Sequence, residues 1–141
     1  DASIWVDFTD HDPRMFRLGV IGDLNAWNPD ELEDSEALFM PQVAPVENPA
    51  FASGKWTHIL INYTGLNTEN GKASLYLDGE LKGAVSNISL PFTWELDQSN
   101  IYLGLGYIGL MDELSIYNRP LTEKEIKALA TLENGVQTIL E

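Results

Sequence analysis

The segment of residues 109–132 constrains the fold most, because it joins a strand pattern directly to a helix start. Within residues 109–117 the side chains alternate between two faces, which predicts a β-strand. One face of this strand carries Leu110, Asp112, Leu114 and Ile116. Pro120 follows shortly afterwards and ends the strand, since proline cannot donate to a sheet ladder.

A capping box follows this strand pattern. Thr122 is a favourable N-cap residue and Glu125 lies three positions later, so each side chain can bond to the other's backbone N–H. Such a cap is worth about 1 kcal/mol. Leu121 and Ile126 have the spacing of a hydrophobic staple. We therefore predict an α-helix near residues 122–133, and because a helix this short needs a packing partner, we predict that it lies on a sheet.

Further strand patterns run through most of the chain. Two alternating runs flank Asp78 and Gly79, which tolerate positive φ, and this favours a β-hairpin with a type I′ turn. The other runs that we interpret as strands are residues 1–8, 15–22, 37–40, 55–64 and 101–108, with 55–64 as a central strand covered on both faces. About seven or eight strands with one late helix predict an all-β fold, a two-sheet antiparallel β-sandwich. We assign residues 1–141 to a single domain.

The net charge of −14 at pH 7 narrows the range of partners. A strongly acidic surface repels nucleic acid phosphates and anionic lipids, so we expect no nucleic acid partner. The sequence contains no apolar run of the length that spans a bilayer, so we expect no membrane insertion. There is no cysteine, which excludes disulfides and thiolate metal sites. The composition therefore leaves neutral ligands, cationic ligands and divalent cations as possible partners.

Four of these segments together resemble the laminin-G-like domains of the concanavalin A-like lectin/glucanase superfamily. They are GKWTHILINY at residues 54–63, ASLYLDGELKG at 73–83, IYLGLG at 101–106 and GLMDELSIYNRPLTEKEIKAL at 109–129. The resemblance implies a concanavalin A-like jelly roll of two sheets. It does not imply one function, because this fold hosts lectins, adhesion modules, glycosidases and lyases.

The sequence departs from the resembled family at its N-terminal side. Family domains carry an aromatic-Asp-Gly strand before the segment that matches ASIWVDF at residues 2–8, and this sequence has no counterpart of that strand. We expect that the sequence is a fragment of a larger protein, or that its missing strands come from elsewhere. An open sheet edge would then invite strand pairing with another chain or domain.

Glycoside cleavage requires two carboxylates on opposite sides of the bond. The glucanases that the resemblance implies place theirs on one strand as E-x-D-x-x-E. Glu95 and Asp97 begin such a motif, but no third acid follows. Asp112 and Glu113 are adjacent, so in a strand they point to opposite faces. We therefore expect no catalysis, with a glycoside hydrolase or polysaccharide lyase as the less favoured alternative.

Calcium is the one cofactor that we expect. Many members of the resembled family hold a calcium ion near the strand with the Asp-Glu pair, which implies Asp112 as a metal ligand. Burial of a bare carboxylate among apolar neighbours is unfavourable, so Asp112 requires a partner. A calcium ion, the guanidinium of Arg119 and backbone N–H groups are the three alternatives.

Carbohydrate binding requires an exposed aromatic ring for stacking, with amide or carboxylate groups nearby for the sugar hydroxyls. The candidate ligand-binding residues are Trp27 with Asn25 and Asn28, then Trp94, then Tyr107. For Trp27 and Trp94 the alternative is a ring buried in the sandwich. Trp5 and Trp56 stand at positions that the resembled family fills with core, so we exclude them as candidates.

These observations predict a noncatalytic, lectin-like module that binds a glycan or polysaccharide. We expect it to belong to a secreted or surface-attached multidomain protein, bacterial in origin. The alternative is a protein-interaction, adhesion or spacer module. Burial of the candidate aromatic side chains distinguishes the two functions, because a sugar requires a free ring face.

Overall fold

The computed structural model describes residues 3–10, 12, 14–21, 35–49, 51–66, 68–88, 97, 100–133 and 135–136. In chain order the elements are β1 (Ser3–Phe8), β2 (Phe16–Ile21), α1 (Ser35–Phe39), η3 (Met40–Gln42), β3 (Val43–Val46), β4 (Ile59–Thr64), β5 (Lys72–Leu77), β6 (Glu80–Ser86) and α2 (Glu123–Ala130). Strands β1, β2 and β3 form one antiparallel sheet in that order, and β4, β5 and β6 form a second. The fold is the predicted all-β, two-sheet antiparallel sandwich of the jelly-roll type, with a short C-terminal helix.

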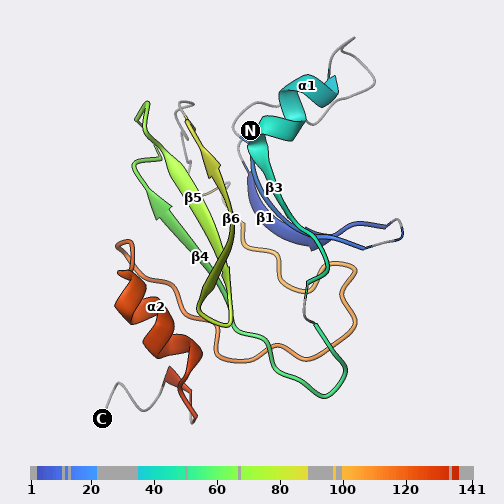
Figure 1. Cartoon of the computed structure of the whole chain (residues 1–141), viewed down its shortest axis with the longest axis vertical. Coiled ribbons are helices and arrows are strands. Elements are labelled where there is room, and N and C mark those ends of the chain that lie inside the picture. The colour runs from blue at the N-terminus through green and yellow to red at the C-terminus, as the bar shows by residue number, and fades with distance from the viewer. Residues whose placement is uncertain are drawn as a thin grey trace.

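The two sheets pack face to face around one hydrophobic core (Figure 1). Alternate side chains of each strand point into this core, including Leu18 of β2 and Leu75 of β5. A Cβ atom added to Gly83 in β6 would lie 3.2 Å from the Cβ of Ala44 in β3. The glycine therefore allows the two sheets to approach closely at this crossing. None of the described helices is long and apolar enough to cross a membrane.

Helix α2 covers the outer face of the second sheet, on the side away from the first sheet (Figure 1). Leu60 of β4 packs with Leu121 and Ile126 in a second, smaller apolar cluster. The predicted capping box is confirmed, since the Thr122 side chain bonds to the N3 backbone and the Glu125 side chain to the N-cap backbone. The predicted staple is also confirmed, because both of its residues are buried in this cluster.

The predicted hairpin around Asp78 and Gly79 is confirmed, and the strands predicted at residues 1–8 and 15–22 form a second hairpin. Strands β1 and β2 pair antiparallel, with Phe8 opposite Phe16 next to the connection. Strands β5 and β6 are joined by Asp78 and Gly79, whose φ values are 50° and 79°. Positive φ at both central residues is the requirement of a type I′ turn, whose twist matches that of the flanking strands.

The strands predicted at residues 101–108 and 109–117 are wrong. Both stretches lack strand structure, and the backbone of Gly104, Gly106 and Glu113 has φ values of 67°, 65° and 55°. Positive φ turns the chain out of the extended conformation, so the alternating side chains never line one face of a sheet. Figure 1 shows this stretch in orange, looping outside the sheets before it reaches α2. The described residues hold six strands, where the pattern predicts about seven or eight.

The short strand predicted at residues 37–40 is also wrong. This stretch forms α1 and the beginning of η3, and the strand β3 comes after it. Pro41 stands in the first turn of η3, a position that suits proline because its missing N–H has no helical partner there. The described helical elements therefore number more than the one that was predicted.

The strand predicted at residues 55–64 is shorter and less central than expected. β4 begins only at Ile59, and it is a terminal strand of its sheet rather than a central strand. Ile59 is exposed, so the prediction that both faces are covered is wrong. The residues before β4 do not join the ladder as a strand, and side-chain contacts from the neighbouring hairpin turn hold them instead.

Candidate functional site

Two of the predicted carbohydrate-binding sets lie outside the described residues. They are Trp27 with Asn25 and Asn28, and Trp94. Their roles therefore stay predictions. Within the described part of the chain, the exposed aromatic side chains are Trp56, Tyr102, Tyr107 and Tyr117. Tyr107 is the one predicted from the sequence, and Trp56 is the one tryptophan among them and lies on a different segment.

Tyr107 is held at the end of a tight turn. Its N–H donates to the carbonyl of Gly104 at 3.0 Å. Its ring and hydroxyl lie against Gly109, where an added Cβ atom would overlap them. The side chain is nevertheless 45% exposed. Tyr107 thus has the exposure that its predicted role requires, and the absence of a side chain at Gly109 leaves the space that its ring occupies.

Trp56 is the aromatic residue that sequence reasoning missed. We excluded it as a candidate because the resembled family fills this position with core, but its side chain is 63% exposed, so the expected core placement is wrong. It precedes β4 in a stretch that lies outside the regular ladder. The available signal was local: Lys55 and Thr57 flank the tryptophan, and the unbroken apolar run begins only at Ile59. An indole in such a polar setting has no neighbours in sequence that pull it into a core.

Asp78 fixes the stretch that carries Trp56. Its Oδ1 accepts from the N–H of His58 at 2.9 Å, and its Oδ2 forms an ion pair with Nζ of Lys55 at 2.8 Å. The N–H of Asp78 donates to the carbonyl of His58 at 2.9 Å. The hydrogen bond from Lys55 is the largest of the effects that lower the pKa of Asp78. The carboxylate therefore stays ionised at neutral pH, and it anchors the residues on both sides of the exposed indole.

His58 is half-buried and directly precedes β4. Burial lowers the pKa of its imidazole, although the nearby Asp78 carboxylate acts in the opposite direction. Its buried Nδ1 atom has no hydrogen-bond partner among the described residues. The ring is therefore neutral at physiological pH, and its backbone rather than its imidazole contacts Asp78.

Trp5 lies on the outer face of the first sheet and is half-buried. Its ring lies against Gly19 of β2, the guanidinium carbon of Arg17 is 5.2 Å from the ring centre, and the ring of Phe39 stacks at 6.4 Å. Arg17 is in turn bound by Asp7 at 2.6 Å. Trp5 is thus covered by several neighbours and offers a ligand less free ring face than Trp56.

Asp112, the predicted metal ligand, is exposed because its stretch is not part of a sheet. Its Oδ1 accepts from the N–H of Glu113 at 2.8 Å. Of the three partners considered for the Asp112 carboxylate, the structure shows a backbone N–H, that of Glu113. The guanidinium of Arg119 pairs with Glu125 instead. The described residues contain no group of three or more acidic or histidine side chains placed to hold a metal ion. Calcium binding stays a prediction.

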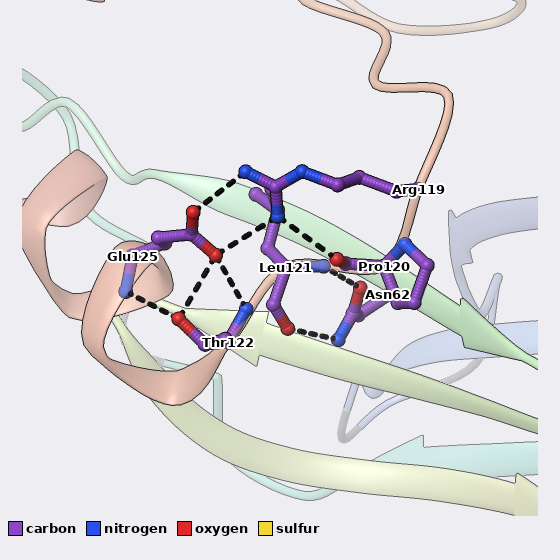
Figure 2. Close-up of polar contacts among 6 residues, drawn as sticks. All are labelled: Asn62, Arg119, Pro120, Leu121, Thr122 and Glu125. Atoms are coloured by element: carbon purple, nitrogen blue, oxygen red, sulfur yellow. Dashed lines mark hydrogen bonds and ion pairs between the residues drawn. The ribbon is translucent and has the colours of Figure 1, made fainter.

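The chain between this exposed stretch and α2 is fixed to β4 by the polar contacts drawn in Figure 2. The Asn62 side chain donates to the carbonyl of Leu121 and accepts from its N–H, both at 2.9 Å. Next to this pair, the N–H of Thr122 donates to Glu125 Oε2 at 2.8 Å. Arg119 donates to both oxygens of the same carboxylate, at 3.0 and 2.6 Å. One end of the exposed stretch is therefore anchored on the second sheet.

The Glu125 contacts predict a pH dependence of stability. The hydrogen bond from Arg119, followed by those from Thr122, lowers the pKa of Glu125 to about 2 from an ordinary value of 4.5. A lowered pKa in the folded state stabilises the fold above the ordinary pKa, and this stabilisation is lost as the pH falls toward 2. We expect the wild type to melt higher than Glu125→Gln at pH 6, and this difference to shrink below pH 4.5.

Thermal unfolding followed by circular dichroism across this pH range measures the difference. Glu123→Gln is the matched control, since it removes a first-turn carboxylate outside the capping box. The Glu123→Gln control is expected to lose stability in acid as the wild type does. A difference between the wild type and Glu125→Gln that is the same at every pH would contradict the assignment.

Comparison with known proteins identifies the family of this chain. The laminin-G family model described as the concanavalin A-like lectin/glucanases superfamily matches residues 5–127. The chain belongs to this superfamily. The resemblance seen in the sequence is thereby confirmed. Because the superfamily name joins lectins and glucanases, membership by itself decides neither sugar binding nor catalysis.

One solved structure that aligns with this chain is the crystal structure of residues 221–444 of an S-layer domain-containing protein from Clostridium thermocellum ATCC 27405. The sequence identity is 18% and the TM-score is 0.48. The alignment covers 92% of the present chain and 63% of the solved chain. The present chain thus spans less than two thirds of the solved one. No curated protein matches the sequence significantly.

Proposed function

We propose that this concanavalin A-like chain is a noncatalytic module that binds a neutral glycan on a secreted or cell-surface protein. The exposure of Trp56 is the observation that carries the proposal. An aromatic ring presents a flat apolar face on which the C–H face of a pyranose can stack, and tryptophan supplies the largest such face. The chain has no cysteine, so an oxidising extracellular compartment forms no disulfide in it.

The polar groups next to Trp56 suit sugar hydroxyls. Lys55 is its neighbour in sequence, and the Asp78 carboxylate is fixed by Lys55 and by the N–H of His58. A fixed carboxylate and ammonium offer an acceptor and donors without losing further side-chain freedom on binding. The net charge of −14 opposes an anionic polysaccharide, which leaves neutral glycans as the favoured class.

The ionised state of Asp78 makes it unsuitable as the general acid of a glycosidase. A glycosidase acid must carry a proton at the working pH, which requires a raised pKa, and a second carboxylate must face it. The pKa of Asp78 is lowered, because Lys55 donates to it. Asp78 therefore stays ionised and cannot protonate a leaving group.

Replacing Trp56 with alanine tests this proposal. A panel of neutral, basic and acidic polysaccharides identifies the ligand of the wild type, and isothermal titration calorimetry then compares the variants. Loss of an interface tryptophan of this kind is expected to weaken binding by roughly 10- to 30-fold. Trp56→Phe is expected to lose much less, since it keeps a ring.

Tyr102→Ala is the matched control, because it removes an aromatic side chain that is also exposed but lies on another segment. It is expected to bind like the wild type. Trp27→Ala, Trp94→Ala and Tyr107→Ala test the sites predicted from sequence in the same titration. If no polysaccharide binds the wild type, or if Trp56→Ala binds as well as Trp56→Phe, the proposed role of Trp56 is wrong.

A further inference from the structure

Residues 101–117, which we call the apolar segment, expose an unusual amount of apolar surface. Its large hydrophobic side chains that are at least 45% exposed are Ile101, Tyr102, Leu103, Leu105, Tyr107, Ile108, Leu110, Met111, Leu114, Ile116 and Tyr117. The largest apolar patch of a typical monomer covers roughly 300–600 Å², and larger ones mark interaction sites. Eleven exposed large hydrophobic side chains within seventeen consecutive residues are a concentration of apolar surface that favours an interaction site.

The backbone of the apolar segment is available for pairing. The described ladders of both sheets leave residues 109–117 out, although their side chains alternate as in a strand. The segment begins its return to the fold at Leu121, which Asn62 of the terminal strand β4 holds by two hydrogen bonds. Residues 109–117 therefore combine strand-like sequence, unpaired backbone groups and a fixed point of attachment on the second sheet.

We propose that residues 109–117 bind an extended segment of another polypeptide by β-strand pairing, and that this partner alternates apolar with basic side chains. Main-chain hydrogen bonds provide the affinity in such complexes, and alternate side chains provide the specificity. The apolar segment contains Asp112 and Glu113 but neither lysine nor arginine. In a strand, Asp112 lies on the same face as Leu110 and Leu114. A basic residue directly opposite Asp112 on the partner strand would form a favourable cross-strand charge pair.

The charge of the whole chain selects against a second copy as the partner. Two chains of net charge −14 repel each other, and the acidic pair of one segment would meet the acidic pair of the other. A basic strand is attracted by the same charges. Among the possible strand donors, charge complementarity therefore favours a different, basic polypeptide.

Glu113 controls whether the segment can pair. In the free chain its φ of 55° bends the backbone. Its N–H donates to Asp112 at 2.8 Å, and its carboxylate accepts from the N–H of Val136 at 3.2 Å. A paired strand requires Glu113 to become extended. A β-branched residue disfavours positive φ, whereas glycine tolerates it. We therefore expect Glu113→Val to bind the strand roughly fivefold more tightly than Glu113→Gly, since both variants lack the carboxylate but differ in their tolerance of positive φ.

Fluorescence anisotropy with short labelled peptides tests the proposal on the full chain. We expect a peptide of alternating valine and lysine to bind. We expect no binding of alternating valine and glutamate, or of a peptide with the composition of the first but its valines and lysines in two blocks. Leu114→Pro removes a backbone donor and is expected to weaken binding by more than about tenfold. Equal binding of the block and alternating peptides overturns the proposal, since charge alone then explains it.

Asp112→Lys separates the local contact from the overall charge. It is expected to weaken binding of the basic peptide by roughly two- to fivefold more than Glu69→Lys does. The control makes the same change of net charge at an exposed turn remote in sequence. Circular dichroism confirms that each variant is folded. Equal losses of peptide affinity in Asp112→Lys and Glu69→Lys would contradict the placement of the basic strand opposite Asp112.

Amide hydrogen exchange provides a second readout. Residues 109–117 are expected to exchange fast in the free chain and slowly with the basic peptide. Slow exchange in the free chain would mean that the segment is already paired, and this overturns the proposal. A dimer in sedimentation equilibrium that protects the same amides also overturns it, since the partner is then a second copy. Neither result bears on glycan binding at Trp56, so the two proposals fail separately.

Discussion

Replacing Leu75 with alanine is expected to lower the free energy of unfolding by about 2–5 kcal/mol. Leu75 is 0% exposed and lies in β5, the middle strand of the second sheet. Strands on both sides and the first sheet in front of it surround the side chain, so its neighbours cannot collapse into the space left behind. The lost contacts therefore add to the lost transfer free energy.

Chemical denaturation followed by circular dichroism measures this effect. Leu81→Ala in the adjacent strand β6 is the matched control, because that leucine is 54% exposed. A surface truncation of this kind is expected to change the free energy of unfolding by less than about 0.5 kcal/mol. If the two variants lose the same free energy, the core does not lie between the two sheets as described.

Asn62→Ala is expected to lower the free energy of unfolding by about 2–4 kcal/mol, from two buried polar groups left without partners. Asn62 both donates to and accepts from the backbone of Leu121, which is itself buried. Without the amide, the N–H and carbonyl of the largely buried Leu121 lose the partners that satisfy them. The start of α2 also loses its attachment to β4, and the buried Ile126 depends on that attachment.

Equilibrium unfolding together with amide exchange at Ile126 checks this second expectation. Asn62→Asp keeps the acceptor for the Leu121 N–H and loses the donor, so an intermediate loss is expected. Thr64→Ala, on the same strand face but exposed, controls for a truncation in β4. If Asn62→Ala is no less stable than Thr64→Ala and Ile126 stays protected, the amide is not what holds the helix to the sheet.

The features that sequence reasoning predicted correctly are those whose partners lie close in the chain. The Asp78–Gly79 turn depends on the φ preferences of two residues, and the capping box joins Thr122 and Glu125 within one helical turn. The alternation of β1 and β2 is likewise satisfied by a neighbouring hairpin. The order of these short-range features along the chain was sufficient to indicate the superfamily and the sandwich.

The candidate site was less predictable, because exposure is a property of the whole fold. Trp56 precedes an apolar strand and resembles a core residue in sequence, yet its side chain is largely exposed. Whether an indole is covered depends on which distant segments pack over it. The sequence around Trp56 contains no information about that, beyond its polar neighbours.

The sequence by itself determined the hairpins, the capped helix and the two-sheet class, since each rests on backbone preferences and contacts between near neighbours. The tertiary structure alone decided the fate of residues 109–117. Their alternation is that of a strand, but a strand exists only where another edge offers hydrogen bonds, and the positive φ of Glu113 bends this stretch instead. An alternating sequence thus specifies a surface that can pair. The tertiary structure decides whether the chain itself supplies the strand with which that surface pairs.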